Sequence, residues 1–308
     1  MDGIHGKRTT HVLIPSVLFL NSLLSFQIYK ERNQCNMLKK LRNISFSICL
    51  LIFLFSFQVS ADHPQIPVSI GNQKIVGYLI EEKTMIPLLE FCKIMDNSSY
   101  ISSYSGGVVS IKARGITISA KSGDFYIEAN GRCFYTDVSC RTIGNTLYVP
   151  IRAAARAFNA TVTWNDNTRS VGIKDYGGVC APADQVYWDG SVLWLSRIIH
   201  AESRGESLLG KIAVGNVVMN RVESYQFPNT IYGVIFDTKY GIQFTPVATG
   251  AIYNNPTEES IRAAKMVLEG TSVNDGVLYF LNPSISTSSW IQKNRKFAFA
   301  IGNHHFYY

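Results

Sequence analysis

One carboxylate in the C-terminal half of the chain lies where it can act as an acid. Read as a helix, one apolar face ends in this carboxylate, in the order Leu195, Ile198, Ile199, Glu202, at positions i, i+3, i+4 and i+7. A carboxyl group that is partly removed from water keeps its proton toward neutral pH and can protonate a leaving group. The spacing makes Glu202 a candidate general acid. The structural alternative is a carboxylate at the helix end that turns to solvent or pairs with Arg204.

A second helix is expected from about Ser207 to Val222. Its inner face is predicted to hold Leu209, Ile212, Ala213, Asn216 and Asn220. Two asparagines on an apolar face are unusual, because buried amides need hydrogen-bond partners. They are expected either to orient the acid or a substrate hydroxyl, or to bond to nearby loops.

The elements that follow are shorter. We expect a third helix from Thr257 to Leu268, ended by Gly270. Residues 276–283 resemble a strand that runs into a turn, and Trp290-Ile291 with residues 297–299 suggest a second strand. The sequence therefore predicts a mostly helical domain at 185–308 with a small β-hairpin.

Composition and charge exclude a nucleic-acid-binding protein. The chain has 308 residues, which suggests about two domains, and a formal charge of +7. Residues 1–61 hold seven Lys/Arg against two Asp/Glu, so the remainder is close to neutral and has no basic run to grip phosphates. We expect no nucleic-acid partner, and the sequence leaves the oligomeric state open.

The first 61 residues are predicted to be a leader. Met37 is followed by three basic residues, an apolar run from Ile44 to Phe57, and Val59-Ser60-Ala61, a small-residue cleavage site. The hypothesis is that 37–61 is a signal peptide and 1–36 an upstream extension, so the mature protein is secreted. The alternative is a membrane anchor that begins at Met1. The predicted mature chain keeps four cysteines, Cys92, Cys133, Cys140 and Cys180, as disulfides or as free buried thiols.

Residues 62–175 carry a weak internal duplication. A proline opens a helical run at Pro87 and again at Pro150, and two short strands follow each run. Asn130-Gly131 is a strong hairpin signal between the copies. This α+β module resembles the copper amine oxidase-like N-terminal domain, best over 148–158 and 169–173. The resemblance implies a module beside cell-wall enzymes, not copper chemistry. Residues 176–184 look like a linker.

The C-terminal part resembles the SleB-like cell wall hydrolases, the spore cortex-lytic enzymes. The resemblance rests on pieces in the expected order: 201–206, Gly210 with Ala213-Val214, 220–222, Phe227-Pro228, Phe244, Gly270, Tyr279-Phe280, Asn282-Pro283, Trp290, 301–304 and Phe306-Tyr307. It implies a lysozyme-like domain at 185–308 that acts on peptidoglycan glycan strands, with Glu202 as catalytic acid.

The expected chemistry follows from the carboxylates. No second carboxylate shares a stripe with Glu202 as a nucleophile should, and candidates are Glu206, Glu223, Asp237 and Asp275. A single acid suffices if the muramic acid 6-hydroxyl attacks its own anomeric carbon, which is lytic transglycosylation, the reaction that the resemblance implies for the family. The predicted substrate-binding residues are Glu206, Asn216, Asn220, Phe244, Tyr279, Asn282, Trp290 and His304.

Three alternatives stay open at this point. One is a hydrolytic muramidase, one is an N-acetylmuramoyl-L-alanine amidase, and one is a non-catalytic wall-binding protein. An amidase would want a zinc site, but His200, His304 and His305 are poorly spaced to share one metal ion. We expect no cofactor or metal, and a membrane contact only through an uncleaved leader. The expected setting is the cell wall or the spore cortex, with cortex hydrolysis during germination as the expected task.

Overall fold

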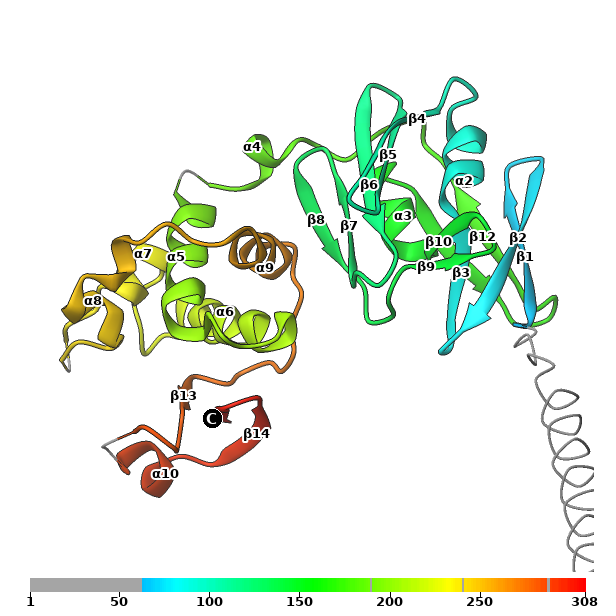
Figure 1. Ribbon diagram of the computed structural model, residues 1–308. Helices are drawn as coiled ribbons and strands as arrows, with labels where there is room; N and C mark the ends of the chain where they lie inside the picture. The colour runs from blue at the N-terminus through cyan, green and yellow to red at the C-terminus, as the bar shows by residue number, and fades with distance from the viewer. Residues whose placement is uncertain (1–62, 189, 240, 287–288) are drawn as a thin grey trace, which may run out of the picture. The chain divides into compact units, whose positions relative to one another are not determined.

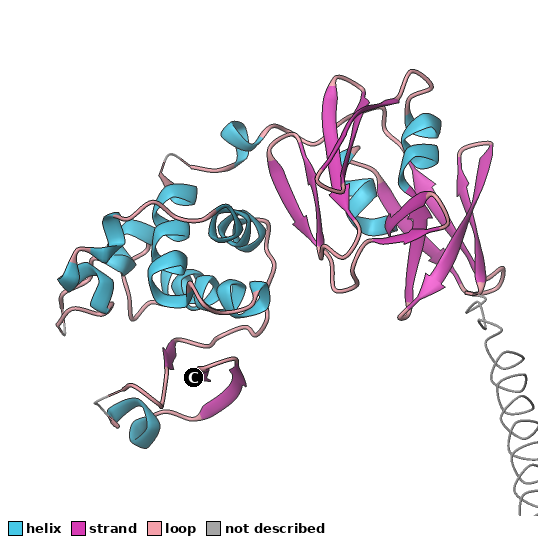
Figure 2. Ribbon diagram, viewed as in Figure 1, coloured by secondary structure: helices cyan, strands magenta, loops and turns pink. Residues whose placement is uncertain are grey.

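The computed structural model describes residues 63–308 except 189, 240 and 287–288. The fold is mixed α+β (Figures 1 and 2). No helix within the described part is long and apolar enough to cross a bilayer. The predicted signal peptide at 37–61 and the predicted extension at 1–36 lie outside the described residues.

A seven-stranded sheet begins the described chain, in the order β11-β12-β1-β2-β3-β10-β9. Its β1–β12 pair is parallel, and the other pairs are antiparallel. The strands are β1 (Gln65–Ile70), β2 (Gln73–Ile80), β3 (Lys83–Pro87), β9 (Arg141–Ile143), β10 (Thr146–Pro150), β11 (Thr161–Asn165) and β12 (Ser170–Lys174). The parallel pair ties the start of the described chain to the last strand before residues 176–184.

A five-stranded antiparallel sheet follows in chain order, from β4 to β8. Its strands are β4 (Tyr100–Ser105), β5 (Val108–Ala113), β6 (Ile116–Lys121), β7 (Tyr126–Ala129) and β8 (Arg132–Tyr135). Asn130 and Gly131 connect β7 to β8 with φ of 53° and 79°. Both lie in the left-handed region that a tight hairpin turn requires, which confirms the predicted turn.

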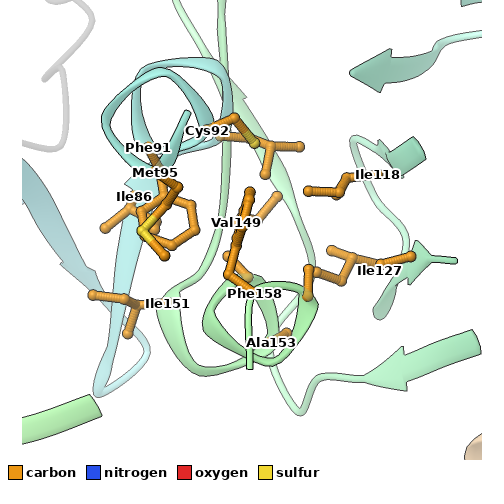
Figure 3. Close-up of a cluster of buried hydrophobic side chains, with 14 of the residues drawn as sticks. Ile86, Phe91, Cys92, Met95, Ile118, Ile127, Val149, Ile151, Ala153 and Phe158 are labelled. Atoms are coloured by element: carbon orange, nitrogen blue, oxygen red, sulfur yellow. The ribbon is translucent and has the colours of Figure 1, made fainter. Parts of the chain in front are cut away.

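Two short helices share one core with both sheets. Helix α2 (Leu88–Met95) follows Pro87, and α3 (Ile151–Ala157) follows Pro150. Figure 3 shows Phe91 and Phe158 between side chains of the two sheets, and their rings meet edge to face with centroids 5.6 Å apart. Burial of such side chains contributes roughly 1.5–3 kcal/mol each, so this core holds the module together.

The two predicted repeats differ in their surroundings. Each has a helix after a proline, as expected, followed by a strand pair. The first pair, β4 and β5, lies in the five-stranded sheet, whereas β11 and β12 lie in the seven-stranded sheet. The duplication therefore stays a hypothesis.

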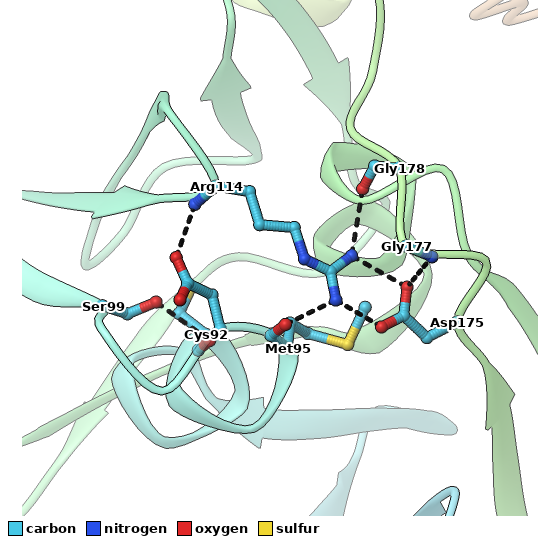
Figure 4. Close-up of polar contacts among 8 residues, drawn as sticks. Cys92, Met95, Ser99, Arg114, Asp175, Gly177 and Gly178 are labelled. Atoms are coloured by element: carbon cyan, nitrogen blue, oxygen red, sulfur yellow. Dashed lines mark hydrogen bonds and ion pairs between the residues drawn. The ribbon is translucent and has the colours of Figure 1, made fainter.

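A partly buried arginine closes the end of this module (Figure 4). Arg114 donates to Asp175 through both terminal nitrogens, and to the carbonyl oxygens of Met95 and Gly178. Its backbone N–H donates to Asp96 at 2.7 Å. The guanidinium holds the pKa of Asp175 below its usual range. One side chain thus joins the end of α2 to the segment after β12.

Three helices form the centre of the C-terminal part. They are α5 (Ser191–Ser203), α6 (Leu208–Glu223) and α9 (Glu258–Leu268), and the side chains of Ser207 and Thr257 cap the last two. A Cβ on Gly215 would lie 2.9 Å from atoms of Ile199 and of Val267. Only glycine permits this close approach of α6 to both neighbours.

Shorter elements complete this part. They are α4 (Ala183–Val186), α7 (Ile231–Ile235), α8 (Thr245–Thr249), a 3-10 turn (Ala251–Tyr253), β13 (Tyr279–Leu281), α10 (Trp290–Asn294), β14 (Phe297–Ile301) and β15 (His304–Tyr307). The last three strands form an antiparallel sheet in the order β13-β15-β14.

Three local predictions are wrong. The two expected strands, β13 and β14, do not form a hairpin with each other, because β15 lies between them and pairs with both. Trp290 and Ile291 begin α10 rather than a strand, with Lys293 N–H bonded to Ser289 O at 3.0 Å. Leu209 is 40% exposed and does not belong to the inner face of α6.

Glu269, at the end of α9, receives hydrogen bonds from three side chains. Its carboxylate accepts from Arg132 at 2.6 Å, from Arg156 at 2.7 Å and from Tyr187 at 2.8 Å, and its side chain is 2% exposed. A carboxylate this deeply buried is tolerated because two guanidinium groups and a phenol satisfy it. Glu269 thus joins the module to the helical part through Arg132 and Arg156, and the predicted domain boundaries stay a prediction.

We expect Arg114→Met to destabilise the protein by about 1–3 kcal/mol, because Asp175 and two backbone carbonyls lose their charged donor. Urea unfolding followed by circular dichroism measures this loss. Arg152→Met is the matched control, because Arg152 is exposed on α3. Equal losses in the two variants would contradict the role of Arg114.

Candidate active site

Glu202 ends the buried stripe of α5. Leu195, Ile198 and Ile199 are fully buried, as the spacing predicts, and Glu202 is partly exposed in the last turn of the helix. The apolar side chains fix the rotation of α5 about its own axis. The carboxyl group is therefore held at the edge of the core, where it opens onto a cleft.

Burial changes the acidity of this carboxyl group. Desolvation raises the pKa of Glu202 to about 7, and the positive charge of Arg221 opposes the rise. Near neutral pH a large share of Glu202 is protonated, which ordinary glutamates are not. The group is thus suited to give a proton and take it back.

Arg221 is the cation whose charge acts on the Glu202 carboxyl group. It lies in the last turn of α6, is 5% exposed, and donates from Nε to Leu278 O at 2.8 Å. Its guanidinium carbon lies 4.9 Å from the ring centroid of Phe227 and 5.1 Å from that of Phe244. Its Nη1 is buried with no hydrogen-bond partner among the described residues.

The sequence contains a signal for Arg221 that our interpretation missed. Val214, Val217 and Val218 are fully buried on α6, and Arg221 follows at i+7. This is the spacing that places Glu202 on α5. Applied to both helices, the same pattern brings an acid and a cation from two buried stripes to one cleft.

The cleft encloses about 1480 Å³. Its lining comes from the ends of α5 and α6, the 225–251 segment, β13 with the turn after it, α10, and the first residue of β15. Of the described residues in this lining, Glu202 alone carries a carboxyl group. The other candidates, Glu206, Glu223, Asp237 and Asp275, do not line the cleft.

Three predicted substrate-binding residues line the cleft near β13. Tyr279 and Trp290 meet edge to face, with ring centroids 6.4 Å apart, and Trp290 is 51% exposed. Asn282 also lines the cleft, and its side chain accepts from Ser284 N–H at 3.0 Å. These residues bring two aromatic rings and a polar turn to the lining of the cleft.

His304 reaches the cleft and Glu206 supports it from behind. Glu206 Oε1 lies 3.6 Å from His304 Nδ1, and its carboxylate accepts from Asn303 N–H at 3.3 Å. The Glu206 side chain is 7% exposed and does not line the cleft. Burial lowers the pKa of His304, and Glu206 opposes this shift. Glu206 therefore positions His304, and its place in the substrate-binding set stays a prediction.

The two asparagines of α6 serve a loop. Asn216 donates to Thr271 O at 2.7 Å and accepts from Val273 N–H at 2.9 Å, and Asn220 donates to Val277 O at 3.0 Å. Neither lines the cleft. Their amides hold residues 271–277, which lead into β13, as one of the two expected roles has it, and their contact with substrate stays a prediction.

Phe244 and His200 are also deeper than expected. Phe244 lines the cleft but is 2% exposed, and its ring lies against the Arg221 guanidinium; its contact with substrate stays a prediction. His200 is buried and its Nδ1 accepts from Thr257 N–H at 3.4 Å. No cluster of three His, Cys, Asp or Glu residues able to hold a metal ion occurs in the part of the chain that the structure describes.

Comparisons of the sequence define the class of protein. Residues 205–307 match the cell wall hydrolase family, and residues 69–173 match the copper amine oxidase N-terminal domain. The C-terminal part of the chain thus resembles the cell wall hydrolases, and the part ahead of it resembles a copper amine oxidase N-terminal domain. The predicted resemblance to both families is confirmed.

Among named relatives, the chain is 40% identical over 105 residues to a spore cortex-lytic enzyme of Bacillus cereus, covering 34% of this chain and 39% of that protein. It is 38% identical to that of Halalkalibacterium halodurans, covering 34% of this chain and 31% of that protein. A solved structure, the catalytic domain of the germination-specific lytic transglycosylase SleB from Bacillus anthracis, is 38% identical with a TM-score of 0.37, covering 42% of this chain and all of that one. The chain thus spans under half the length of the two spore cortex-lytic enzymes.

We expect the Glu202 carboxyl to titrate near pH 7 in ¹³C-labelled protein, because burial disfavours its charged form. In Arg221→Met it should titrate at a higher pH, because the opposing positive charge is gone. Arg204→Met, which removes an exposed charge two residues away, should leave the titration pH of the Glu202 carboxyl group unchanged. An ordinary carboxyl titration near pH 4 in the unchanged protein would refute the buried acid.

Gly302 makes room for the Glu206 carboxylate. Its φ is +54°, and an added Cβ would lie 2.8 Å from Glu206 Cδ. We expect Gly302→Ala to cost about 1–3 kcal/mol more than Gly276→Ala, because Glu206 must give up its contacts at Asn303 and His304. Gly276 also has a positive φ, +81°, but has open space around it.

Thermal unfolding of both variants measures the difference. Similar losses would mean that backbone conformation alone requires glycine at the β14–β15 turn.

Proposed function

We propose that this protein is a lytic transglycosylase that cleaves the glycan strands of peptidoglycan. The observation that carries the proposal is a large cleft in which the one carboxyl group of the described lining is Glu202, with a pKa raised to about 7. The family and the names of the relatives support the substrate class.

Glu202 acts first as an acid. It gives its proton to the oxygen of the glycosidic bond, and that bond breaks at the anomeric carbon of muramic acid. The proton is available near neutral pH because burial raises the pKa of Glu202 to about 7. Arg221 then stabilises the carboxylate that forms, since it is a permanent cation that acts on Glu202.

The substrate supplies the nucleophile. The 6-hydroxyl of the same muramic acid attacks its anomeric carbon, and its proton passes to the Glu202 carboxylate. A new C1–O6 bond closes a 1,6-anhydro ring, and Glu202 regains its starting form. Glycosidases that use water or a protein nucleophile usually place a second carboxylate about 5–9.5 Å from the first. A cleft with a single carboxyl group favours the intramolecular attack.

The remaining lining residues bind the strand. Tyr279 and Trp290 offer apolar ring surface to sugar faces, and Asn282 offers a polar turn. His304, which Glu206 supports, also lines the cleft and offers a hydrogen bond to the strand. Binding along several sugars aligns one glycosidic bond with Glu202.

The substrate setting that we propose is the spore cortex during germination, after secretion through the leader at 37–61. The names of the relatives as spore cortex-lytic enzymes support the setting. The basic, apolar and small-residue pattern of 37–61 supports secretion. We propose that residues 62–175 serve as a wall-associated module that is joined to the catalytic part at 185–308.

The test is mass spectrometry of products released from purified cortex. The unchanged protein should release anhydro-muramic ends, and its kcat/KM should fall as the pH rises through about 7, because the acid form of Glu202 is lost. Glu202→Gln should lower the rate by a factor of about 10³ or more, since the amide cannot donate a proton.

Glu223→Gln is the matched control, because Glu223 is exposed on the same domain and lies outside the cleft. It should keep full activity. New reducing ends in place of anhydro ends would indicate a hydrolytic muramidase, and free glycan strands without stem peptides would indicate an amidase. Activity that survives Glu202→Gln would overturn the assignment of the acid.

A further inference from the structure

Two arginines of the cleft lie against one tyrosine. The guanidinium carbon of Arg295 is 4.3 Å from the ring centroid of Tyr279, and that of Arg221 is 5.6 Å from it. Arg295 also lies 5.2 Å from the ring centroid of Trp290. All four side chains line the cleft that contains Glu202.

Neither guanidinium forms an ion pair with a residue that the structure describes. Arg295 Nε and Arg221 Nη1 are buried and have no hydrogen-bond partner among those residues. Aromatic rings attract a guanidinium but do not accept its in-plane N–H groups in the way that an oxygen does. Both arginines therefore keep donors that a ligand can satisfy.

The charge of the cleft has the matching sign. Arg221 and Arg295 line it, whereas Glu202 contributes the one carboxyl group of the described lining. In its acid form Glu202 is neutral, so the cleft is cationic in the state that begins the reaction. Unpaired cations at a partly dry site are costly unless a bound anion compensates them. Arginine held flat by rings presents a fork that fits a carboxylate.

We propose that Arg295, held against Tyr279 and Trp290 and assisted by Arg221, binds a carboxylate carried by the lactyl side chain of muramic acid. This inference rests on the proposed function and names a feature of its substrate. The carboxylate belongs to the attached stem peptide, or to the bare lactyl group where the peptide is missing. Its binding makes muramic acid, rather than the neighbouring glucosamine, the sugar whose anomeric carbon lies at the bond that Glu202 protonates.

The first experiment needs no variant. Glycan strands free of teichoic acid are offered in three forms: native with stem peptides, stripped of peptides so that lactyl carboxylates are bare, and native with all carboxylates converted to amides. The unchanged protein should show a KM about tenfold higher on the amidated strands than on the native strands. The stripped strands identify the source of the carboxylate. A KM on stripped strands like that on native strands indicates that the bare lactyl carboxylate is bound, and a KM like that on amidated strands indicates a carboxylate of the stem peptide.

The second experiment assigns the residue. Arg295→Gln should raise KM on native strands to about the value for amidated strands, a roughly tenfold change, and should change KM on amidated strands little. Arg295→Lys should recover part of the difference, because a point charge replaces the fork. Lys296→Gln is the matched control, since Lys296 is exposed next to Arg295 and lies outside the cleft.

Equal KM values on native and amidated strands would overturn the inference. An Arg295→Gln variant that weakens both substrates equally would do the same. The proposed function fails in a different way, through the chemical nature of the released ends. If the products lack anhydro ends but KM is still higher on amidated than on native strands, the proposed reaction fails and the carboxylate subsite is retained.

Discussion

The close approach of α5, α6 and α9 is the constraint on which the cleft depends. At Gly215 the backbone of α6 comes so near to Ile199 and Val267 that a methyl group does not fit. With the three helices locked at this point, the last turns of α5 and α6 have fixed positions. Glu202 and Arg221 are the side chains at those ends, so packing in the core sets the electrostatics of the cleft.

Polar side chains of α6 then carry the order outward. Asn216, Asn220 and Arg221 hydrogen-bond to backbone atoms between residues 271 and 278, and Tyr279 follows directly in β13. On the other side, Glu206 holds the β14–β15 turn and His304. Much of the cleft wall is short strands and loops, and buried polar groups of the helical part hydrogen-bond to them.

The parts of this fold that follow local rules could be predicted from the sequence. The α5 stripe, the caps at Ser207 and Thr257, and the Asn130-Gly131 turn each depend on a few neighbouring residues, and the structure has them in place. Trp290 was misplaced because its apolar neighbours fit a short strand as well as one turn of helix. The tasks of Asn216 and Glu206 depend on partners 55 and 97 residues away, which spacing along one helix does not reveal.

The four cysteines that the structure describes are free and buried, in place of the disulfides that the sequence also allowed. Burial raises the pKa of Cys92 and of Cys140 to about 12, and it raises that of Cys133 and Cys180 as well. A thiol that stays protonated is a poor nucleophile and a slow partner in thiol exchange. Packing and hydrogen bonds, with no covalent cross-link among these four thiols, therefore hold the described fold together.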